Sequence, residues 1–390
     1  MNNFIFQNTT KIYFGKDQLV HLAEEIKQYG SRVLLTYGGG SIKRIGLYDR
    51  IMAVLKETGI TVTELSGVEP NPRHTTVNRG ADICKKENID VLLAVGGGST
   101  IDCTKAIAAA AYYDGDSWDL VKQKAQVTKA LPILTVLTLA ATGSEMDCGG
   151  VITNMDTNEK LGLIHPLLQP KVSFLDPTNT FSVNAFQTAC GSADIISHVL
   201  DVNYFTTGEK MDMASRMQEE VIRTVVKFAP VAIKEPDNYE ARANLMWAST
   251  WALNGFLDNG IMQAPTCHMI EHELSAFYDI THGLGLAILT PRWMEYILDE
   301  TTAPQFKNFG VNLFSVDSSL SEMDGAKEAI KRLSDFLYQD LGLQSSLSEI
   351  GIKDDSQFAA MAEKACPGGV LNGYKPLTPK DVVAIFNNCL

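Results

Sequence analysis

The chain has 390 residues, more than a single hydrophobic core usually supports, so two domains with a cleft between them are expected. Apolar residues make up 45% of the composition and charged residues 20%, which is typical of a globular protein and excludes extensive disorder. The net charge of −13 opposes binding to phosphate backbones and anionic lipid surfaces, so nucleic-acid and membrane partners are not expected.

The N-terminal segment, MNNFIFQNTTKIYFG, lacks the basic region and long apolar run of an export signal. The longest apolar run, around residues 131–141, is too short to span a bilayer. Seven cysteines are spread along the chain without a C-x-x-C pair, which favours a reducing compartment, and we expect a cytoplasmic protein. Cys267 stands beside His268, and we expect it to be a buried apolar side chain rather than a metal ligand.

The first half of the chain alternates short apolar runs with segments of helical spacing, the pattern of a parallel α/β sheet. It predicts strands at 32–37, 61–65, 90–95, 133–139 and 172–176, helices at 47–58, 75–88 and 100–113, and a hairpin over 151–164. From about residue 181 helical spacing dominates, with helices predicted at 189–205, 212–228, 239–257 and 326–341. We therefore expect an α/β domain over residues 1–180 and a helical domain over residues 181–390.

Two predicted strands lead directly into glycine turns that begin helices. The turns consist of Gly38, Gly39, Gly40 and Ser41, and of Gly97, Gly98 and Ser99. A strand that passes through glycine into a helix presents backbone N–H groups and the positive end of the helix dipole to an anion. Neither turn has the G-x-G-x-x-G spacing, and one such turn alone is equally well explained as a structural turn. Two at consecutive strand-to-helix junctions favour a site for the pyrophosphate of a dinucleotide.

Three polar residues near these turns allow two interpretations each. Asp102 lies one turn into the helix that Ser99 begins, where it can contact a ligand or complement the helix dipole. Thr138 and Thr142 flank the end of the next strand, where ligands of open α/β sheets collect, although threonine is also a common strand former.

Histidines cluster in the second half of the chain. Three of the seven, His268, His272 and His282, fall in one short window, and His198 follows Asp194 by four residues. That spacing places Asp194 and His198 on one face of a helix, and their aliphatic neighbours indicate that the helix is buried. Buried polar groups need partners or a metal. One carboxylate and three imidazoles suit Fe²⁺, Zn²⁺ or a similar divalent ion.

With these residues assembled, the chain resembles the iron-activated alcohol dehydrogenases, and within them the butanol dehydrogenases of anaerobic bacteria. The match extends over essentially the whole chain. The stretches that carry it are YGGGSIKRIGLYD at 37–49, GVEPNPR at 67–73, GGGSTIDCTK at 96–105, TGSEMD at 142–147, NEKLG at 158–162, ADIISH at 193–198, EARANLMWAS at 240–249 and CHMIEHELSAFYDITHG at 267–283.

The resemblance implies a fold shared with dehydroquinate synthase: a Rossmann-like dinucleotide-binding α/β domain, an all-α C-terminal domain, and a cleft for cofactor, metal and substrate. It implies that the metal is bound by Asp194, His198, His268 and His282. It implies cofactor contacts at Asn71, Gly97, Gly98, Ser99, Asp102, Thr138, Thr142 and Lys160. By analogy a homodimer is expected, in which a strand at 11–14 pairs across a sheet edge.

The function implied is reversible hydride transfer between NAD(P)(H) and a primary alcohol or aldehyde such as butanol or butanal. The metal would act as a Lewis acid that lowers the pKa of the alcohol or polarises the aldehyde carbonyl. His272 matches a further histidine of the family, near the nicotinamide and the substrate. It either relays the proton, since histidine titrates near neutral pH, or only shapes the pocket.

The chain departs from the family pattern in two places. Relatives commonly have TTAGTGSE where this chain has TLAATGSE at 138–145, so Leu139 and Ala141 change the packing near the nicotinamide. The segment CGG at 148–150 stands where bulkier residues are expected, which would reshape the substrate pocket. Neither departure involves a predicted metal ligand.

Other functions fit parts of the pattern. A metal-dependent lyase or cyclase of the dehydroquinate synthase type must bind a polyanionic substrate, and residues 181–300 contain few basic residues near the proposed ligands. A non-catalytic dinucleotide sensor would leave the metal ligands and His272 without a purpose. A zinc protease of the H-E-x-x-H type is excluded because Glu271 stands at the wrong position between His268 and His272.

The first glycine turn predicts a preference for NADPH over NADH. NAD-selective sites commonly place a carboxylate at the 2′-hydroxyl of the adenine ribose, and this turn has no acid before Asp49. Ser41 can donate a hydrogen bond to a 2′-phosphate, and Lys43 and Arg44 supply positive charge. If the two basic side chains only solvate the start of the helix, both cofactors would be used alike.

Overall fold

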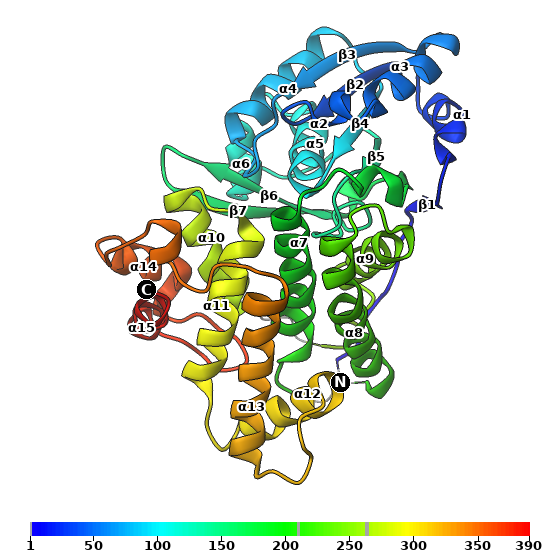
Figure 1. The fold of residues 1–390 in the computed structure, drawn as a ribbon. Helices are drawn as coiled ribbons and strands as arrows, with labels where there is room; N and C mark the ends of the chain where they lie inside the picture. Colours follow the sequence, from blue (N-terminus) through cyan, green and yellow to red (C-terminus); the bar gives the residue numbers. More distant parts are fainter. Residues whose placement is uncertain (1, 209–210, 262–264) are drawn as a thin grey trace. The chain divides into compact units, whose positions relative to one another are not determined.

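The computed structural model describes residues 2–208, 211–261 and 265–390 (Figure 1). The chain folds into two compact units. One, the α/β unit, comprises Gln7–Val183 and Asp237–Asn254. The other, the helical unit, comprises Met1–Phe6, Asn184–Pro236 and Gly255–Leu390.

A six-stranded parallel sheet forms the centre of the α/β unit, with the strand order β1-β8-β5-β4-β2-β3. The strands are β1 (Lys11–Phe14), β2 (Arg32–Tyr37), β3 (Thr61–Ser66), β4 (Val91–Gly96), β5 (Ile133–Leu137) and β8 (Val172–Leu175). Strands β4, β5 and β8 are buried along their whole length, because both faces of a parallel sheet are covered. The five sheet strands predicted between residues 32 and 176 are confirmed to within two residues, and the strand expected at 11–14 is β1.

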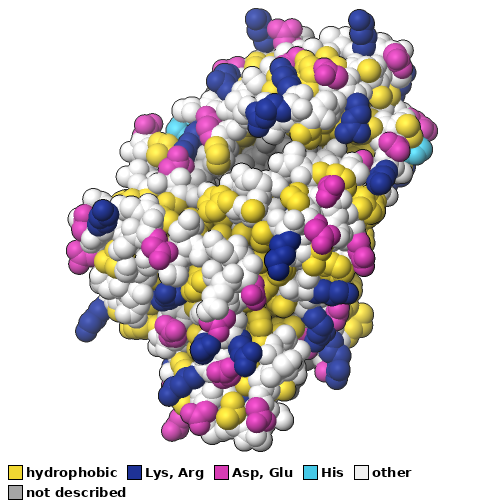
Figure 2. Space-filling view, in the orientation of Figure 1, with side chains coloured by type: hydrophobic (Ala, Val, Ile, Leu, Met, Phe, Trp, Pro, Cys, Tyr) yellow, Lys and Arg dark blue, Asp and Glu magenta, His cyan; other side chains and the backbone are white. Residues whose placement is uncertain are grey.

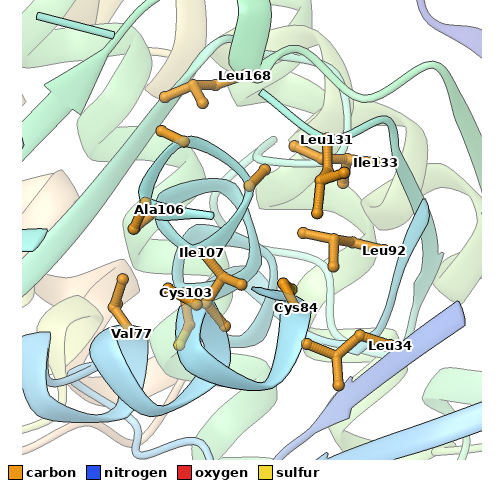
Figure 3. Close-up of a cluster of buried hydrophobic side chains, with 14 of the residues drawn as sticks. Leu34, Val77, Cys84, Leu92, Cys103, Ala106, Ile107, Leu131, Ile133 and Leu168 are labelled. Atoms are coloured by element: carbon orange, nitrogen blue, oxygen red, sulfur yellow. The ribbon is translucent and has the colours of Figure 1, made fainter. Parts of the chain in front are cut away.

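Helices cover both faces of this sheet (Figure 1). On one face lie α4 (His74–Lys86), α5 (Gly98–Ala110) and α6 (Ser117–Val121), and on the other α1 (Leu22–Lys27), α2 (Ser41–Arg44) and α3 (Leu47–Glu57). Successive residues of β2 alternate between the two cores, since Leu34 packs beneath α4 and α5 (Figure 3) and Leu35 packs beneath α1 and α3. The predicted Rossmann-like architecture is confirmed.

A hairpin of β6 (Gly149–Asn154) and β7 (Glu159–Ile164) packs on α5. The sequence predicted this hairpin over residues 151–164. A Cβ atom at Gly150 would stand 3.2 Å from the Cα atom of Asp102, so glycine permits this close approach. The helix α9 (Tyr239–Ala252) also belongs to the α/β unit, where its Met246 is buried in a cluster with Leu137 and Leu175. The boundary predicted at residue 180 would place α9 in the helical domain. Helical spacing predicts that a helix is buried, but not which surface it packs against.

The helical unit consists of packed helices, as predicted. Its helices are α7 (Ala185–Ser197), α8 (Asp212–Lys234), α10 (Thr266–Tyr278), α11 (His282–Ile297), α12 (Ala303–Phe314), α13 (Glu322–Asp335), α14 (Phe358–Ala365) and α15 (Pro379–Asn388), with π-helical segments at His198–Tyr204 and Phe336–Asp340. Within it α11 packs against α7, α10 and α13. Short 3₁₀ helices complete the chain at Gln18–His21, Pro166–Leu168, Pro177–Thr180, Ser348–Ile350 and Pro367–Gly369.

Basic and acidic side chains are interspersed on the face drawn in Figure 2, so the net charge of −13 is not gathered into one patch there. Across residues 2–208, 211–261 and 265–390, no helix has the length and apolar character needed to cross a membrane. All seven cysteines are free thiols, and Cys267 is fully buried, as expected.

Candidate metal centre and dinucleotide site

The predicted metal ligands converge around one oxygen atom of Asp194 in the helical unit. Nδ1 of His198, one turn further along the same helix, lies 3.6 Å from Asp194 Oδ1. Nε2 of His268, on α10, lies 4.0 Å from that oxygen. Nε2 of His282, the first residue of α11, lies 3.8 Å from it. One carboxylate oxygen therefore faces three ring nitrogens from three helical segments.

The burial of this group fits a divalent metal ion. Asp194, His198 and His268 are buried, and His282 is partly exposed. Within the part of the chain that the structure describes, His198 Nδ1 and His268 Nε2 have no hydrogen-bond partner, an arrangement that costs about 1–3 kcal/mol per buried group. Ligand atoms of Asp194, His268 and His282 all lie within 4.8 Å of one another, close enough to share one ion. A cation at this point would complete the coordination of these buried atoms.

Two glycines explain how the helices come close enough. A Cβ atom at Gly283 would lie 2.1 Å from the carbonyl oxygen of Cys190, so only glycine lets the start of α11 approach α7. A Cβ atom at Gly285 would lie 2.7 Å from Cγ of Glu271, so glycine also permits the close packing of α11 on α10. The sequence H-G-L-G at 282–285 thus brings His282 to Asp194.

The helix that carries Asp194 changes its winding next to the site. From His198 to Tyr204 it is π-helical, and the N–H of Phe205 donates to the carbonyl of Leu200 at 2.8 Å. Short π-helical segments within α-helices often occur at functional sites, because the widened turn redirects side chains. The sequence predicted a continuous α-helix here, since helical spacing does not distinguish a π turn.

His272 lies one helical turn beyond His268 on α10 and is buried. Its ring centroid stands 5.7 Å from that of His282. The structure therefore places His272 beside the predicted ligands and within the same unit. Two buried carboxylates next to the cluster, Asp201 and Glu271, were not predicted as site residues, although Asp201 follows Asp194 at the helical spacing of seven residues.

Both predicted glycine turns lie at the carboxyl edge of the sheet in the α/β unit. Strands β2 and β4 are adjacent and parallel, so the turns that follow them leave the same edge side by side. Strand β3 pairs with the other side of β2, which makes the β2–β4 boundary the point where the chain changes direction across the sheet. Ligands of open α/β sheets bind at such a point. Gly40 has a φ of 90°, a left-handed conformation that favours glycine.

The remaining predicted cofactor residues gather at that edge. Thr142 packs against Gly98, where a Cβ atom would lie only 2.4 Å from its side chain. The N–H of Thr138 donates to the carbonyl of Gly96 at 3.0 Å. Asn71 is in the segment after β3. The carbonyl of the next residue, Pro72, accepts a hydrogen bond from the N–H of Thr153 in β6, and Thr153 pairs with Lys160 in β7. Leu139, which departs from the family pattern, also lies at this edge, since a Cβ atom added at Gly97 would be 3.0 Å from the Cβ atom of Leu139.

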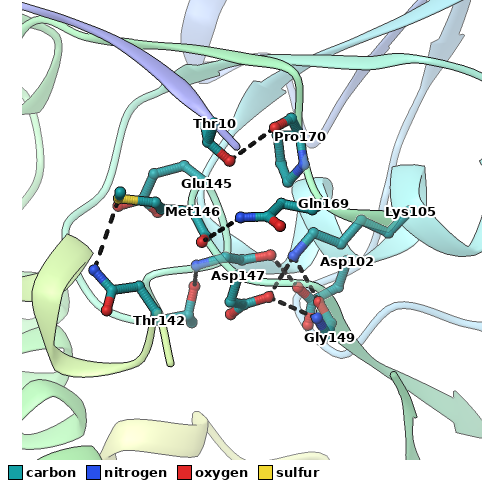
Figure 4. A network of polar contacts seen from close by, with 12 residues as sticks. Thr10, Asp102, Lys105, Thr142, Glu145, Met146, Asp147, Gly149, Gln169 and Pro170 are labelled. Carbon is teal, nitrogen blue, oxygen red and sulfur yellow. Dashed lines mark hydrogen bonds and ion pairs between the residues drawn. The ribbon is translucent and has the colours of Figure 1, made fainter. Parts of the chain in front are cut away.

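Asp102 belongs to a polar network that sequence reasoning missed (Figure 4). Its carboxylate accepts hydrogen bonds from the Ser144 hydroxyl at 2.6 Å and the N–H of Val151 at 2.9 Å. Lys105, fully buried one turn further along α5, donates to Asp147 Oδ1 and to the carbonyl of Gly149, both at 2.6 Å. Burial raises the pKa of Asp102 to about 6. The network ties α5 to the hairpin, and a charged lysine in an alanine-rich helix was the signal for it.

Glu145 is a second buried acid in this region. It accepts a hydrogen bond from the hydroxyl of Thr250, on α9, at 2.5 Å. Burial raises the pKa of Glu145 to about 7. The contact fixes α9 to the loop between β5 and β6 inside the α/β unit.

Comparison with known proteins identifies the family. The family model for iron-containing alcohol dehydrogenase matches residues 9–177, and the model for the C-terminal part of the Fe-containing alcohol dehydrogenase family matches residues 188–390. The chain is 51% identical to NADH-dependent butanol dehydrogenase A of Clostridium acetobutylicum, with 99% of each chain covered. It is 36% identical to the NADPH-dependent aldehyde reductase YqhD of Escherichia coli, over 93% of each chain.

A solved structure agrees with this assignment. The crystal structure of NADH-dependent butanol dehydrogenase A from Thermotoga maritima matches with a TM-score of 0.93 and 41% identity, covering 100% of this chain and 99% of that one. The predicted resemblance and fold are confirmed by these matches. The chain belongs to the iron-containing alcohol dehydrogenase family and is a metal-dependent alcohol dehydrogenase that uses NAD(P)(H).

Proposed function

We propose that this enzyme transfers hydride reversibly between a nicotinamide dinucleotide and a primary alcohol or aldehyde of about the size of butanol or butanal. The observation that carries the proposal is the convergence of one carboxylate oxygen and three ring nitrogens in the helical unit. Of four relatives that are 47–51% identical, two are named butanol dehydrogenases and two probable butanol dehydrogenases, which supports a four-carbon substrate.

The metal ligands in this proposal are Asp194, His198, His268 and His282. A divalent metal held there supplies a Lewis acid that polarises a carbonyl or lowers the pKa of an alcohol. The donor set contributes one negative charge and three neutral rings, so a divalent cation keeps net positive charge toward the substrate. Iron is supported by the family name and zinc by the mixture of nitrogen and oxygen donors.

His272 is the proposed proton relay. It lies beside His282 and one turn from His268, so it adjoins the predicted ligands. Histidine is a common proton carrier in enzymes, and hydride transfer to an aldehyde is accompanied by proton transfer to its oxygen. The alternative is that His272 only shapes the pocket.

The proposed dinucleotide site is the carboxyl edge of the sheet. The first turn of α5 and the turn after β2 would receive the pyrophosphate through their N–H groups, because both follow adjacent parallel strands. The Ser99 hydroxyl donates to the carbonyl of Pro70, so Ser99 would serve through its backbone. The proposed contacts are Gly38, Gly39, Gly40, Ser41, Asn71, Gly97, Gly98, Ser99, Asp102, Thr138, Thr142 and Lys160.

We propose NADH as the preferred cofactor, in place of the NADPH that the sequence predicted. Lys43, on which that prediction partly depended, lies 3.8 Å from a carboxylate oxygen of Glu64. Its ammonium group is also 4.5 Å and 5.1 Å from the ring centroids of Tyr48 and Tyr37. These contacts draw the Lys43 side chain toward Glu64 and the two tyrosines and so weaken its attraction for a 2′-phosphate, while Arg44 is exposed. The relatives at 47–51% identity are named as NADH-dependent, while the relative at 36% is named as NADPH-dependent.

A turnover panel tests this function. Protein purified without oxygen and loaded with Fe²⁺ or Zn²⁺ should reduce butanal faster than longer or anionic aldehydes, with a higher kcat/KM for NADH than for NADPH. Consumption of a polyanionic substrate without net cofactor oxidation would instead support the lyase alternative. Cofactor binding with no turnover of C3–C5 aldehydes would support a sensor.

Assembly and location are also proposals. Strand β1 pairs with β8 and ends the sheet, so its outer edge can accept a strand from a second copy, and we propose a homodimer. Light scattering coupled to size-exclusion chromatography would give twice the chain mass of 42.7 kDa for a dimer. The seven free thiols support a reducing, cytoplasmic location.

A further inference from the structure

Two buried carboxylates outside the predicted ligand set contact two of the predicted ligands. We infer that Asp201 and Glu271 are positioning residues that hold His268 and His282 with Nε2 toward the metal, and so determine metal affinity and coordination geometry. The inference rests on the proposed ligand set.

Asp201 holds His268 at two points. Its Oδ2 accepts a hydrogen bond from the backbone N–H of His268 at 2.9 Å and lies 3.0 Å from Nδ1 of the same residue. Asp201 is 1% exposed, so this contact is shielded from water. A carboxylate at Nδ1 favours the tautomer with the proton on that nitrogen, which leaves the lone pair on Nε2. Nε2 is the atom that faces Asp194, at 4.0 Å.

Glu271 holds His282 in the same way from a different helix. Its Oε2 contacts Nδ1 of His282, and its Oε1 accepts a hydrogen bond from the Ser275 hydroxyl at 2.5 Å. Glu271 is fully buried, and Gly285 provides the space for it. The Nε2 atom of His282 again faces Asp194, at 3.8 Å. Ser275 thus holds the carboxylate of Glu271 in place, and that carboxylate fixes the orientation of the His282 ring.

The two contacts share one geometry although they arise in different elements. Asp201 is in the π-helical segment that follows α7, and Glu271 is on α10. Each binds the ring nitrogen that points away from Asp194. A buried carboxylate is costly to desolvate unless it is well partnered, and a carboxylate that accepts from a metal-binding histidine orients the ring and raises its basicity. Loss of such a partner typically lowers metal affinity 10- to 100-fold.

The test compares Asp201→Asn and Glu271→Gln with a matched variant, Glu219→Gln, in the full-length protein. Glu219 lies on α8 of the same unit and accepts hydrogen bonds from Tyr204 and Asn312. Zn²⁺ affinity is measured by competition with a chromophoric chelator, and the coordination geometry by the visible absorption of the Co²⁺-loaded protein. We expect about 10- to 100-fold weaker Zn²⁺ binding and an altered Co²⁺ spectrum in the first two variants only. Zn²⁺ affinities within twofold of the unsubstituted protein, with unchanged Co²⁺ spectra, would overturn the inference.

A measurement on the unsubstituted protein covers the case in which either variant fails to fold. In the proton NMR spectrum of the Co²⁺-loaded protein, the Nδ1 protons of His268 and His282 should give two slowly exchanging, paramagnetically shifted signals. Their absence would contradict the positioning role. Failure of the protein to bind Zn²⁺ or Co²⁺, or full binding by Asp194→Ala, would instead refute the proposed ligand set.

Discussion

The ammonium group of Lys105 lies 2.6 Å from Oδ1 of Asp147, and the lysine side chain is completely buried. A second acid, Asp102, is one turn away on the same helix (Figure 4). A buried cation beside two acids is sensitive to substitution, because removing the cation leaves the negative charge of the acids without compensation. The pair therefore determines how firmly α5 is attached to the hairpin in the α/β unit.

Lys105→Met should destabilise the α/β unit by up to about 3–5 kcal/mol, because the substitution removes the cation beside the partly buried Asp147 carboxylate, which keeps a hydrogen bond from the backbone N–H of Gly149. Urea titration followed by hydrogen exchange in α5 measures this. The matched variant is Lys122→Met, which removes a more exposed pair with Glu159 and should cost about 1 kcal/mol or less. Equal losses of unfolding free energy in the two variants would show that the Lys105–Asp147 pair contributes no more to stability than the exposed pair.

Glu145 should make stability depend on pH. Burial raises the pKa of Glu145 to about 7 from an ordinary value of 4.5, so the folded state favours the protonated acid. The stabilisation is complete below about pH 4.5 and is lost as the pH rises through 7. Over this window the unfolding free energy of the unsubstituted protein should fall, relative to Glu145→Gln, by up to about 3 kcal/mol. Parallel pH profiles for the two proteins would contradict this.

Gly283→Ala should separate α11 from α7. The added Cβ atom would lie 2.1 Å from the carbonyl oxygen of Cys190, and backbone must move to relieve the overlap. We expect a loss of about 1–3 kcal/mol together with weaker metal binding, since His282 begins α11. Gly162→Ala is the control, because a Cβ atom there meets nothing within 4 Å. Retention of normal metal affinity in Gly283→Ala would mean that this approach does not form the site.

Glu64→Gln should shift cofactor use toward NADPH. The substitution releases Lys43 from its 3.8 Å contact, and the freed charge can attract a 2′-phosphate. An exposed pair of this kind predicts a change of about two- to fivefold in the ratio of kcat/KM for NADPH to that for NADH. The reverse effect is expected from Gly38→Asp, which adds a carboxylate to the turn. An unchanged ratio in both variants would place the ribose away from this turn.

The sequence predicted the strands of the α/β unit because apolar runs followed by glycine turns are a local signal. It also predicted Asp194, His198, His268 and His282 as neighbours, partly from helical spacing and partly from the family pattern. The position of α9 depends on Met246 and Thr250 meeting residues far away in the sequence, which periodicity does not encode.

The positioning residues were missed for a related reason. Glu271 was considered only as part of a protease motif, and its contact with His282 arises because Gly285 lets two helices pack closely. Asp201 reaches His268 from a π-helical segment, whose winding the sequence pattern did not reveal. Lys105 is separated from Asp147 by 42 residues, so only the packing of the hairpin on α5 brings them together.

The dependence of catalysis on the proposed metal is tested by titrating metal-free protein with Fe²⁺ or Zn²⁺ while butanal-dependent oxidation of NADH is followed. Activity should rise in proportion to bound metal, reach its maximum at one ion per chain, and be absent in Asp194→Ala together with tight metal binding. His272→Ala should bind the ion normally but lose about 10- to 10⁴-fold in activity. Full activity of the metal-free protein, or unchanged metal affinity and activity in Asp194→Ala, would show that this cluster does not hold a catalytic metal.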